Sequence, residues 1–140
     1  MKNRRNFLKN SALLATGLAV SAPLLAKSES VNSKSPDFPG IIFTQKEQGR
    51  WEGKAGSHVP VVTVKGNMLT MQTFHPMTEE HYIVRHTVVD KNGKLLGAKT
   101  FHPTDVRAIS TIELPNGFHG KLYATSFCNK HDFWLKEFSV

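Results

Sequence analysis

Short apolar runs separated by turn residues follow one another along the chain from residue 41 onward. These runs are rich in β-branched and aromatic residues, which is typical of strands in a packed sheet. Gly66-Asn67 and Asn92-Gly93 lie between runs and predict tight turns. The predicted strands cover residues 41–44, 59–65, 68–73, 81–90, 95–101, 106–114, 121–127 and 133–138. Because no convincing helical pattern follows residue 26, we expect an all-β, immunoglobulin-like sandwich of about seven strands.

The first 26 residues have a different pattern. Arg4 and Arg5 precede an apolar stretch over residues 12–26, and the stretch ends in small residues, as in a secretory signal. The arginine pair with the following Phe-Leu-Lys resembles the twin-arginine export motif, which implies export of the folded protein to the periplasm. An uncleaved membrane anchor is the alternative, but the 15 residues of this stretch are fewer than the roughly 20 that a spanning helix needs.

Composition and charge limit the kinds of partner. The formal charge is +7, but four of the 18 basic residues belong to the first 26 residues, so the remainder carries 14 basic and 11 acidic side chains. That remainder contains no basic run interleaved with aromatic residues, so we expect no nucleic-acid partner. Residues 27–40 are polar and rich in serine and proline, and they are predicted as a linker to a single domain, residues 41–140.

The histidines and the single cysteine are the candidate chemical groups. Five of these residues are predicted to lie in loops or at strand ends: His58, His75, His81, Cys128 and His131. In a sandwich the loops gather at the two ends, so these side chains can converge on one point. Imidazole suits iron, copper and zinc, and a thiolate is the soft ligand of many redox sites. The pattern therefore indicates a metal site, which would also give a solitary cysteine a role.

Three motifs resemble one known family closely. They are HVPVV at residues 58–62, HPMTEEHYI at residues 75–83 and CNKHDFW at residues 128–134. In order, spacing and flanking residues they are similar to the superoxide reductase family, which includes neelaredoxin and the iron domain of desulfoferrodoxin. The resemblance covers roughly residues 41–140.

The resemblance implies a mononuclear non-haem iron, Fe2+/Fe3+, with one ion per chain. His58, His75, His81 and His131 would be its four equatorial ligands and Cys128 its axial ligand, leaving the sixth position open in the ferrous state. Superoxide would take one electron there and become hydrogen peroxide. Backbone N–H groups after Cys128 would tune the sulfur. The resemblance also makes a homo-oligomer plausible.

Two departures from the family pattern matter. The family often carries Glu-Lys directly before the first histidine ligand, whereas this chain has Gly56 and Ser57. Lys54 and Glu52 lie slightly upstream, and our hypothesis is that Lys54 is the catalytic residue that attracts the superoxide anion. The chain also lacks the further cysteines that hold the second iron centre of desulfoferrodoxins. Its electrons would therefore come from an external donor, rubredoxin-like or another redox protein.

Rival interpretations remain open at this point. An exported copper- or iron-binding electron-transfer protein without superoxide reductase activity would also use histidines and a cysteine on a β-sandwich. A blue-copper site usually has a methionine soon after its late histidine, and no methionine follows Cys128. A closed zinc site uses four ligands, fewer than the candidates here. His86, His102 and His119 match no family ligand and are interpreted as structural or surface residues.

Overall fold

The computed structural model describes residues 38–140. The predicted export signal (residues 1–26) and most of the predicted linker (residues 27–40) lie outside the described residues. Within the described range the elements are β1 (Ile42–Phe43), η1 (Gly49–Trp51), α1 (Ala55–His58), β2 (Val61–Lys65), β3 (Met68–Thr73), β4 (Ile83–Asp90), β5 (Leu95–Thr100), β6 (Ala108–Glu113), β7 (Lys121–Cys128) and β8 (Asp132–Ser139). No helix among residues 38–140 has the length and apolar character to cross a membrane.

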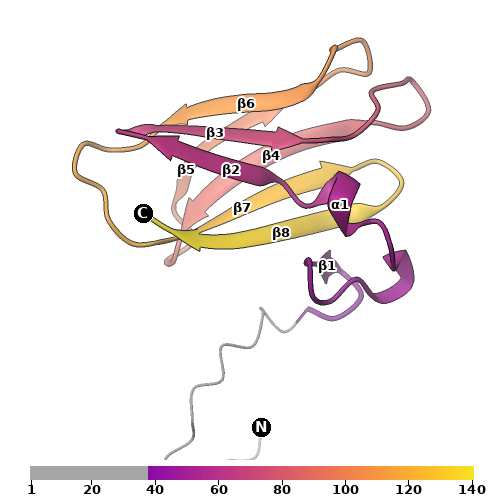
Figure 1. Ribbon diagram of the computed structural model, residues 1–140, viewed down its shortest axis with the longest axis horizontal. Helices are drawn as coiled ribbons and strands as arrows, with labels where there is room; N and C mark the ends of the chain where they lie inside the picture. The colour runs from indigo at the N-terminus through magenta and orange to yellow at the C-terminus, as the bar shows by residue number, and fades with distance from the viewer. Residues whose placement is uncertain (1–37) are drawn as a thin grey trace, which may run out of the picture. The chain divides into compact units, whose positions relative to one another are not determined.

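Two sheets pack face to face. One sheet has the strand order β1-β8-β7-β4-β5 and the other the order β2-β3-β6, as Figure 1 shows. Neighbouring strands are antiparallel except β1, which pairs in parallel with β8. The all-β sandwich predicted from the sequence is confirmed.

The expectation of no helix was wrong for one short segment. Residues Ala55–His58 form a single α-helical turn, and η1 precedes it. Four residues are too few to show a helical period, so the sequence pattern could not reveal this turn. The helix also delays the following strand, which begins at Val61, after Pro60, instead of at residue 59.

Strand β4 likewise begins two residues later than predicted, at Ile83. The chain before it folds into a turn in which His81 and Thr78 exchange backbone hydrogen bonds of 3.1 and 3.2 Å. The backbone of His81 is therefore committed to the turn and not to the sheet.

The core alternates as the β pattern requires. Along β7, every second residue is buried, from Leu122 through Ala124 and Ser126 to Cys128. The sheets approach each other closely where Gly97 of β5 faces Ile112 of β6. A Cβ at Gly97 would lie 2.7 Å from Cγ2 of Ile112, so only glycine permits this contact.

Candidate metal centre

Five separate backbone positions bring the candidate ligands to one end of the sandwich. His58 ends α1, His75 and His81 lie in the β3–β4 loop, Cys128 ends β7, and His131 lies in the β7–β8 turn. Figure 1 shows the β3–β4 and β7–β8 connections and α1 at the same end of the two sheets. One donor atom from each of the five residues lies within 4.8 Å of the others. The structure therefore gathers all five residues singled out in the sequence.

The four imidazole rings lie at the corners of a square. Neighbouring ring centroids are 4.3–4.7 Å apart in the order His58, His75, His81, His131 and back to His58. Neighbouring ring planes are close to perpendicular, at 70–88°. The one diagonal measured, between His58 and His81, is longer at 6.2 Å, as a square requires.

The nitrogen atoms at the centre of this square have the spacing of metal ligands. His58 Nε2 and His131 Nδ1 are 2.9 Å apart, His81 Nε2 and His131 Nδ1 are 3.0 Å apart, and His75 Nε2 and His81 Nε2 are 3.1 Å apart. With metal–nitrogen bonds of about 2.1 Å, adjacent ligands at right angles lie about 3.0 Å apart, whereas tetrahedral ligands lie about 3.4 Å apart. The distances therefore fit a square arrangement around one ion.

The Cys128 sulfur lies over the middle of the square. Its distances to His131 Nδ1 and His75 Nε2, which are opposite corners, are 3.7 and 3.9 Å. It also lies within 4.8 Å of the other two nitrogens. An atom beside the square could not be near all four corners, so the sulfur occupies an axial position.

Backbone carbonyls fix the tautomers of two rings. His58 Nδ1 donates to the Lys54 carbonyl oxygen at 2.9 Å, and His75 Nδ1 donates to the Pro76 carbonyl oxygen at 2.5 Å. A neutral imidazole carries one N–H, so Nε2 of each ring presents a lone pair to the centre.

Hydrogen bonds alone cannot satisfy the square. If Nε2 of His58 and His75 are both lone pairs, their neighbours His131 and His81 must each supply a hydrogen to bond them. Both nitrogens of the 3.0 Å contact between His81 Nε2 and His131 Nδ1 would then be donors, and two donors cannot form a hydrogen bond with each other. A cation at the centre removes this conflict because all four nitrogens can then offer lone pairs to it.

Burial keeps the rings in the form that binds metal. Desolvation is the largest cause that lowers the pKa of His58 and His75 to about 4, and the neighbouring histidines lower it further. The pKa values of His81 and His131 are also lowered, again mainly by burial. All four rings are therefore neutral near pH 7, as ligands must be.

The thiol of Cys128 has a mixed environment. Its side chain is 1% exposed, and burial is the main cause that raises its pKa. The backbone N–H groups of Lys130 and His131 hydrogen-bond to the sulfur and act in the opposite direction. Such donors stabilise a thiolate once a cation is present to balance its charge.

The side chain of Asn129 links the two ligand-bearing loops by hydrogen bonds. The sequence had not indicated a role for this residue. Asn129 Oδ1 accepts from the Tyr82 N–H at 3.0 Å, and Asn129 Nδ2 donates to the Glu80 carbonyl oxygen at 3.0 Å. This side chain therefore fastens the β7–β8 turn to the β3–β4 loop. It lies inside the CNKH motif, which was the signal that could have identified it.

A second group of contacts holds the segment before α1. Asp132 Oδ2 accepts from Arg50 at 2.6 Å and from Trp51 Nε1 at 2.9 Å. The Trp51 ring packs edge-on against the His131 ring with a centroid distance of 4.6 Å. Asp132 itself has φ = 61°, an unusual backbone conformation for a residue other than glycine. The sequence offered no signal for this long-range contact.

The structure places Lys54 beside the ring of histidines, which it contacts through its backbone. It is the exposed residue that precedes α1, and its backbone carbonyl is the hydrogen-bond acceptor of His58. Its positive charge contributes to lowering the pKa of His81 and His131. Gln48 Oε1 steadies this segment by accepting from the N–H groups of Gly53 and Ala55 at 2.9 and 3.2 Å.

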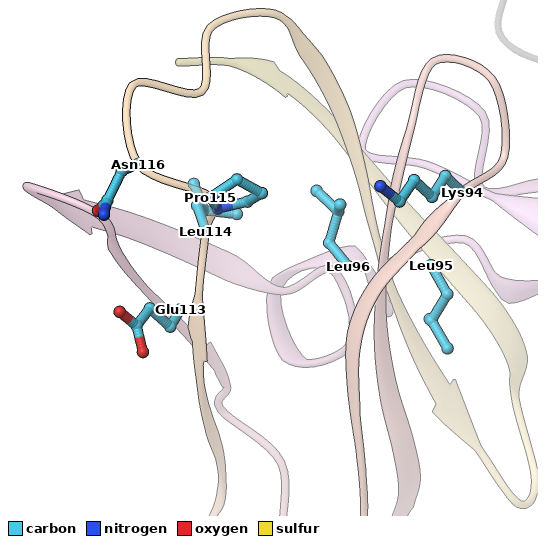
Figure 2. Close-up of a pocket in the computed structure, with 7 residues that line it drawn as sticks. All are labelled: Lys94, Leu95, Leu96, Glu113, Leu114, Pro115 and Asn116. Carbon is cyan, nitrogen blue, oxygen red and sulfur yellow. The ribbon is translucent and has the colours of Figure 1, made fainter.

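The other histidines lie outside the cluster. His102 and His119 are exposed in loops, whereas His86 is fully buried in β4. The metal centre also lies apart from the hollow drawn in Figure 2. That hollow, of about 420 Å³, lies where β5 begins and β6 ends, and its lining residues include no histidine or cysteine.

Comparisons with known proteins agree on one family. The sequence pattern of the family described as Desulfoferrodoxin matches residues 48–137, a range that includes all five gathered residues. No protein with a curated description matches the chain.

Solved structures are similar to this chain in fold. A superoxide reductase (neelaredoxin) from Ignicoccus hospitalis is 24% identical with a TM-score of 0.61; the match covers 75% of this chain and 98% of that one. A superoxide reductase (1Fe-SOR) from Giardia intestinalis is 24% identical with a TM-score of 0.55, covering 60% and 98%. A superoxide reductase in the oxidized state is 26% identical with a TM-score of 0.54, covering 71% and 96%.

Proposed function

This chain belongs to the desulfoferrodoxin family, and we propose that it is a superoxide reductase with one mononuclear non-haem iron. The proposed ligands are the nitrogens of His58, His75, His81 and His131 and the sulfur of Cys128. The observation that carries the proposal is the square of four nitrogens, 2.9–3.1 Å along its measured edges, with a thiol sulfur over its centre.

The donor set favours iron over the other metals considered. A structural zinc ion takes four ligands in a tetrahedron, and the measured edges are too short for that geometry. A blue-copper ion takes two histidines and a cysteine in a trigonal arrangement, which would leave two of these histidines without a role. Four imidazoles and one thiolate would hold a six-coordinate ion and leave room for one small molecule.

The reaction needs one electron and two protons for each superoxide. An iron ion held by these five residues would supply that electron in its ferrous form, and superoxide would take up two protons from water to give hydrogen peroxide. An external redox protein, rubredoxin-like or of another kind, must return the electron. Cys128 is the one cysteine of the chain, so the polypeptide cannot build a second thiolate-rich iron centre to store it.

The residues of the chain hold the centre ready for this step. Carbonyl acceptors orient His58 and His75, and two backbone N–H groups stabilise negative charge on the Cys128 sulfur. Negative charge on this sulfur would favour release of a reduced, negatively charged product from an ion held here. His81 and His131 are only partly buried, so small molecules and protons from water can reach their side of the centre.

We infer that Lys54 attracts superoxide to this side. Its charge acts on His81 and His131, and no carboxylate stands directly before His58, where Gly56 and Ser57 lie in α1. An exposed cation near a reactive centre raises the rate of encounter with an anion, and salt weakens the effect.

Replacing Lys54 tests this role. The change Lys54→Ala should lower the second-order rate constant for superoxide by roughly 10-fold or less and flatten its dependence on ionic strength. Lys65→Ala is the matched control, because Lys65 is an exposed lysine at the far end of β2. A rate constant and salt dependence equal to those of the unsubstituted protein would rule out the steering role of Lys54.

Export to the periplasm is part of the proposal. What supports it is the Arg4-Arg5 pair followed by Phe7-Leu8-Lys9 and an apolar stretch. Conservative replacement of both arginines by lysine should leave the protein in the cytoplasmic fraction, whereas unchanged periplasmic recovery would contradict the twin-arginine route. The proposed homo-oligomer is tested by measuring the molar mass of the purified protein in solution.

Metal analysis combined with a pulse of superoxide tests the function itself. The protein isolated from its native compartment should contain about one iron per chain, and its ferrous form should be oxidised in a fast second-order reaction with superoxide. An electron-transfer or metal-storage protein would hold iron or copper but show no such reaction. The absence of the Glu-Lys pair before His58 makes such a metal-binding protein the main alternative to a superoxide reductase.

A further inference from the structure

A chain of four hydrogen-bonded side chains is buried between the two sheets, and the proposed reaction does not use it. His86 Nδ1 lies 2.8 Å from Ser110 Oγ, His86 Nε2 lies 2.9 Å from Thr73 Oγ1, and Thr73 Oγ1 lies 3.0 Å from Ser126 Oγ. All four residues are at most 2% exposed. Buried polar groups are costly unless they are bonded, and each of these has a partner.

Two residues of this hydrogen-bonded chain lie two positions before proposed metal ligands. Thr73 is the last residue of β3, two positions before His75, and Ser126 lies in β7, two positions before Cys128. In a strand, residues two apart face the same side, so Ser126 faces inward directly below Cys128. The bond from Thr73 to Ser126 therefore joins the two sheets one step below the ligands.

His86 closes the same layer from β4. It pairs with Ser126 in the β4–β7 register, and its ring packs edge-on against Phe101 with a centroid distance of 4.8 Å. Phe101 in turn belongs to the small apolar cluster that contains Cys128 and Ile83. His86 therefore contacts the ligand-bearing region in two ways: by a hydrogen bond to Thr73 and by packing against Phe101.

The bonds have one consistent direction. Burial, and next the charge of Lys99, lower the pKa of His86 to about 4, so the ring is neutral near pH 7 and carries a single N–H. Thr73 uses its one hydroxyl hydrogen to donate to Ser126. His86 Nε2–H must therefore donate to Thr73, and Nδ1 must accept from Ser110. Every bond then points from Ser110 towards the ligand strand β7.

We propose that this chain, Ser110–His86–Thr73–Ser126, holds the ligand-bearing end of β3 to that of β7 and so fixes the Cys128 sulfur over the four histidine nitrogens. Apolar packing is not directional, whereas hydrogen bonds fix both distance and orientation. The inference rests on the proposed metal centre, in which His86 and Thr73 are positioning residues that do not touch the ion. This positioning role explains why buried polar side chains lie here, although apolar side chains would be enough for folding.

The change Thr73→Val tests the proposal, because valine keeps the shape of threonine and removes the hydroxyl that links His86 to Ser126. We expect a shifted thiolate-to-metal charge-transfer band in the oxidised protein, a changed reduction potential and about 10-fold weaker iron binding. Thr73→Ser restores the hydroxyl and should restore the band and the potential. If Thr73 only stabilised the fold, Thr73→Val would lower the free energy of unfolding without shifting the band or the reduction potential.

Val88→Ala is the matched control. Val88 is a fully buried residue of β4, two positions further from the metal than His86, and it belongs to the apolar cluster. The control should lower stability while leaving the band and the potential unchanged. An unshifted band and potential in Thr73→Val, or an equal shift in Val88→Ala, would overturn the proposal.

Should Thr73→Val fail to fold, Ser126→Ala carries the same test with a smaller change in volume. An unshifted band and potential in Ser126→Ala would likewise overturn the proposal. The outcome is separable from that of the proposed function. A protein that binds iron but does not react with superoxide would refute the reductase, while the band shift would still decide the role of the polar chain.

Discussion

The two halves of the sandwich core are built on the same strands but from different side chains. The half away from the metal centre is wholly apolar: Leu69, Met71, Val88, Ile112, Leu114, Leu122 and Ala124. In the half next to the centre, which we call the polar half, each of the same four strands contributes one buried polar residue beside the apolar Ile83 and Ala108. These polar residues are Thr73 on β3, His86 on β4, Ser110 on β6 and Ser126 on β7.

This difference separates stability from positioning. The apolar half buries area and stabilises the fold without specifying orientation. The polar half gives up hydrophobic stabilisation for directional bonds directly beneath Cys128 and His75. Proteins commonly accept such a cost at functional sites, where side-chain position matters more than free energy of folding. The two halves should therefore respond differently to acid, to cavity-forming substitutions and to loss of the metal ligands.

Acid should affect the polar half most. His58, His75 and His86 have folded-state pKa values of about 4, compared with an ordinary value of 6.5, because they are buried. The unfolded chain therefore binds more protons between these values, and stability is lost as pH falls from about 6.5 towards 4. Each histidine contributes about 1.4 kcal/mol per pH unit within that window.

Urea denaturation of the metal-free protein at pH 7, 6 and 5 measures this slope. His86→Gln should reduce the slope, because one of the three groups is removed. Val88→Ala should lower the free energy of unfolding by the same amount at every pH. A slope that His86→Gln leaves intact would show that the acid sensitivity arises elsewhere.

A cavity in the apolar half should cost stability without changing the metal centre. Leu69 is fully buried in β3, and Leu69→Ala should lower the free energy of unfolding by about 2–5 kcal/mol. The charge-transfer band and the iron content of the folded variant should stay as in the unsubstituted protein. An altered band would show that packing in the apolar half also positions the metal ligands.

Loss of the Cys128 sulfur should change the metal centre while leaving the metal-free fold intact. In Cys128→Ala the charge-transfer band should vanish, and the rate with superoxide should fall at least about 100-fold, since removal of mere outer partners of a ligand already costs 10–100-fold. The apolar half should keep the metal-free protein folded, as far-ultraviolet circular dichroism would show. Retention of both the band and the rate would exclude Cys128 as a ligand.

The smallest effect is expected from the clamp between the ligand loops. Asn129→Ala removes the bonds to Tyr82 and Glu80, and it should weaken iron binding by about 10-fold. Asn116→Ala is the matched control, because Asn116 is exposed in the β6–β7 loop (Figure 2), which lies at the opposite end of the sandwich (Figure 1). Titration of both metal-free variants with ferrous iron compares them, and equal affinities would contradict the clamp.

The sequence predicted most of the strands because the signals are local. Turn residues such as Gly66-Asn67 and alternating runs such as the one that became β7 mark strands without knowledge of their partners. The gathering of His58, His75, His81, Cys128 and His131 could also be expected, since loops of a sandwich meet at its ends. Their role as ligands, and that of Lys54, stay predictions.

What the sequence could not reveal depends on contacts between distant residues. The bond from Arg50 to Asp132 joins positions 82 residues apart, and the parallel pairing of β1 with β8 joins positions that are still more distant in the sequence. The polar layer was missed for another reason. A histidine in a strand, such as His86, was interpreted as structural or surface, and only the three-dimensional register shows that Thr73, Ser110 and Ser126 meet it.

X-ray absorption spectroscopy at the iron edge of the metal-loaded protein measures whether the four histidines and Cys128 bind one ion. We expect a shell of at least four nitrogens at about 2.1 Å together with one sulfur at about 2.3 Å or slightly longer. A tetrahedral shell of four ligands, or a shell without sulfur, would contradict the assignment of the square of histidines and Cys128 to one ion.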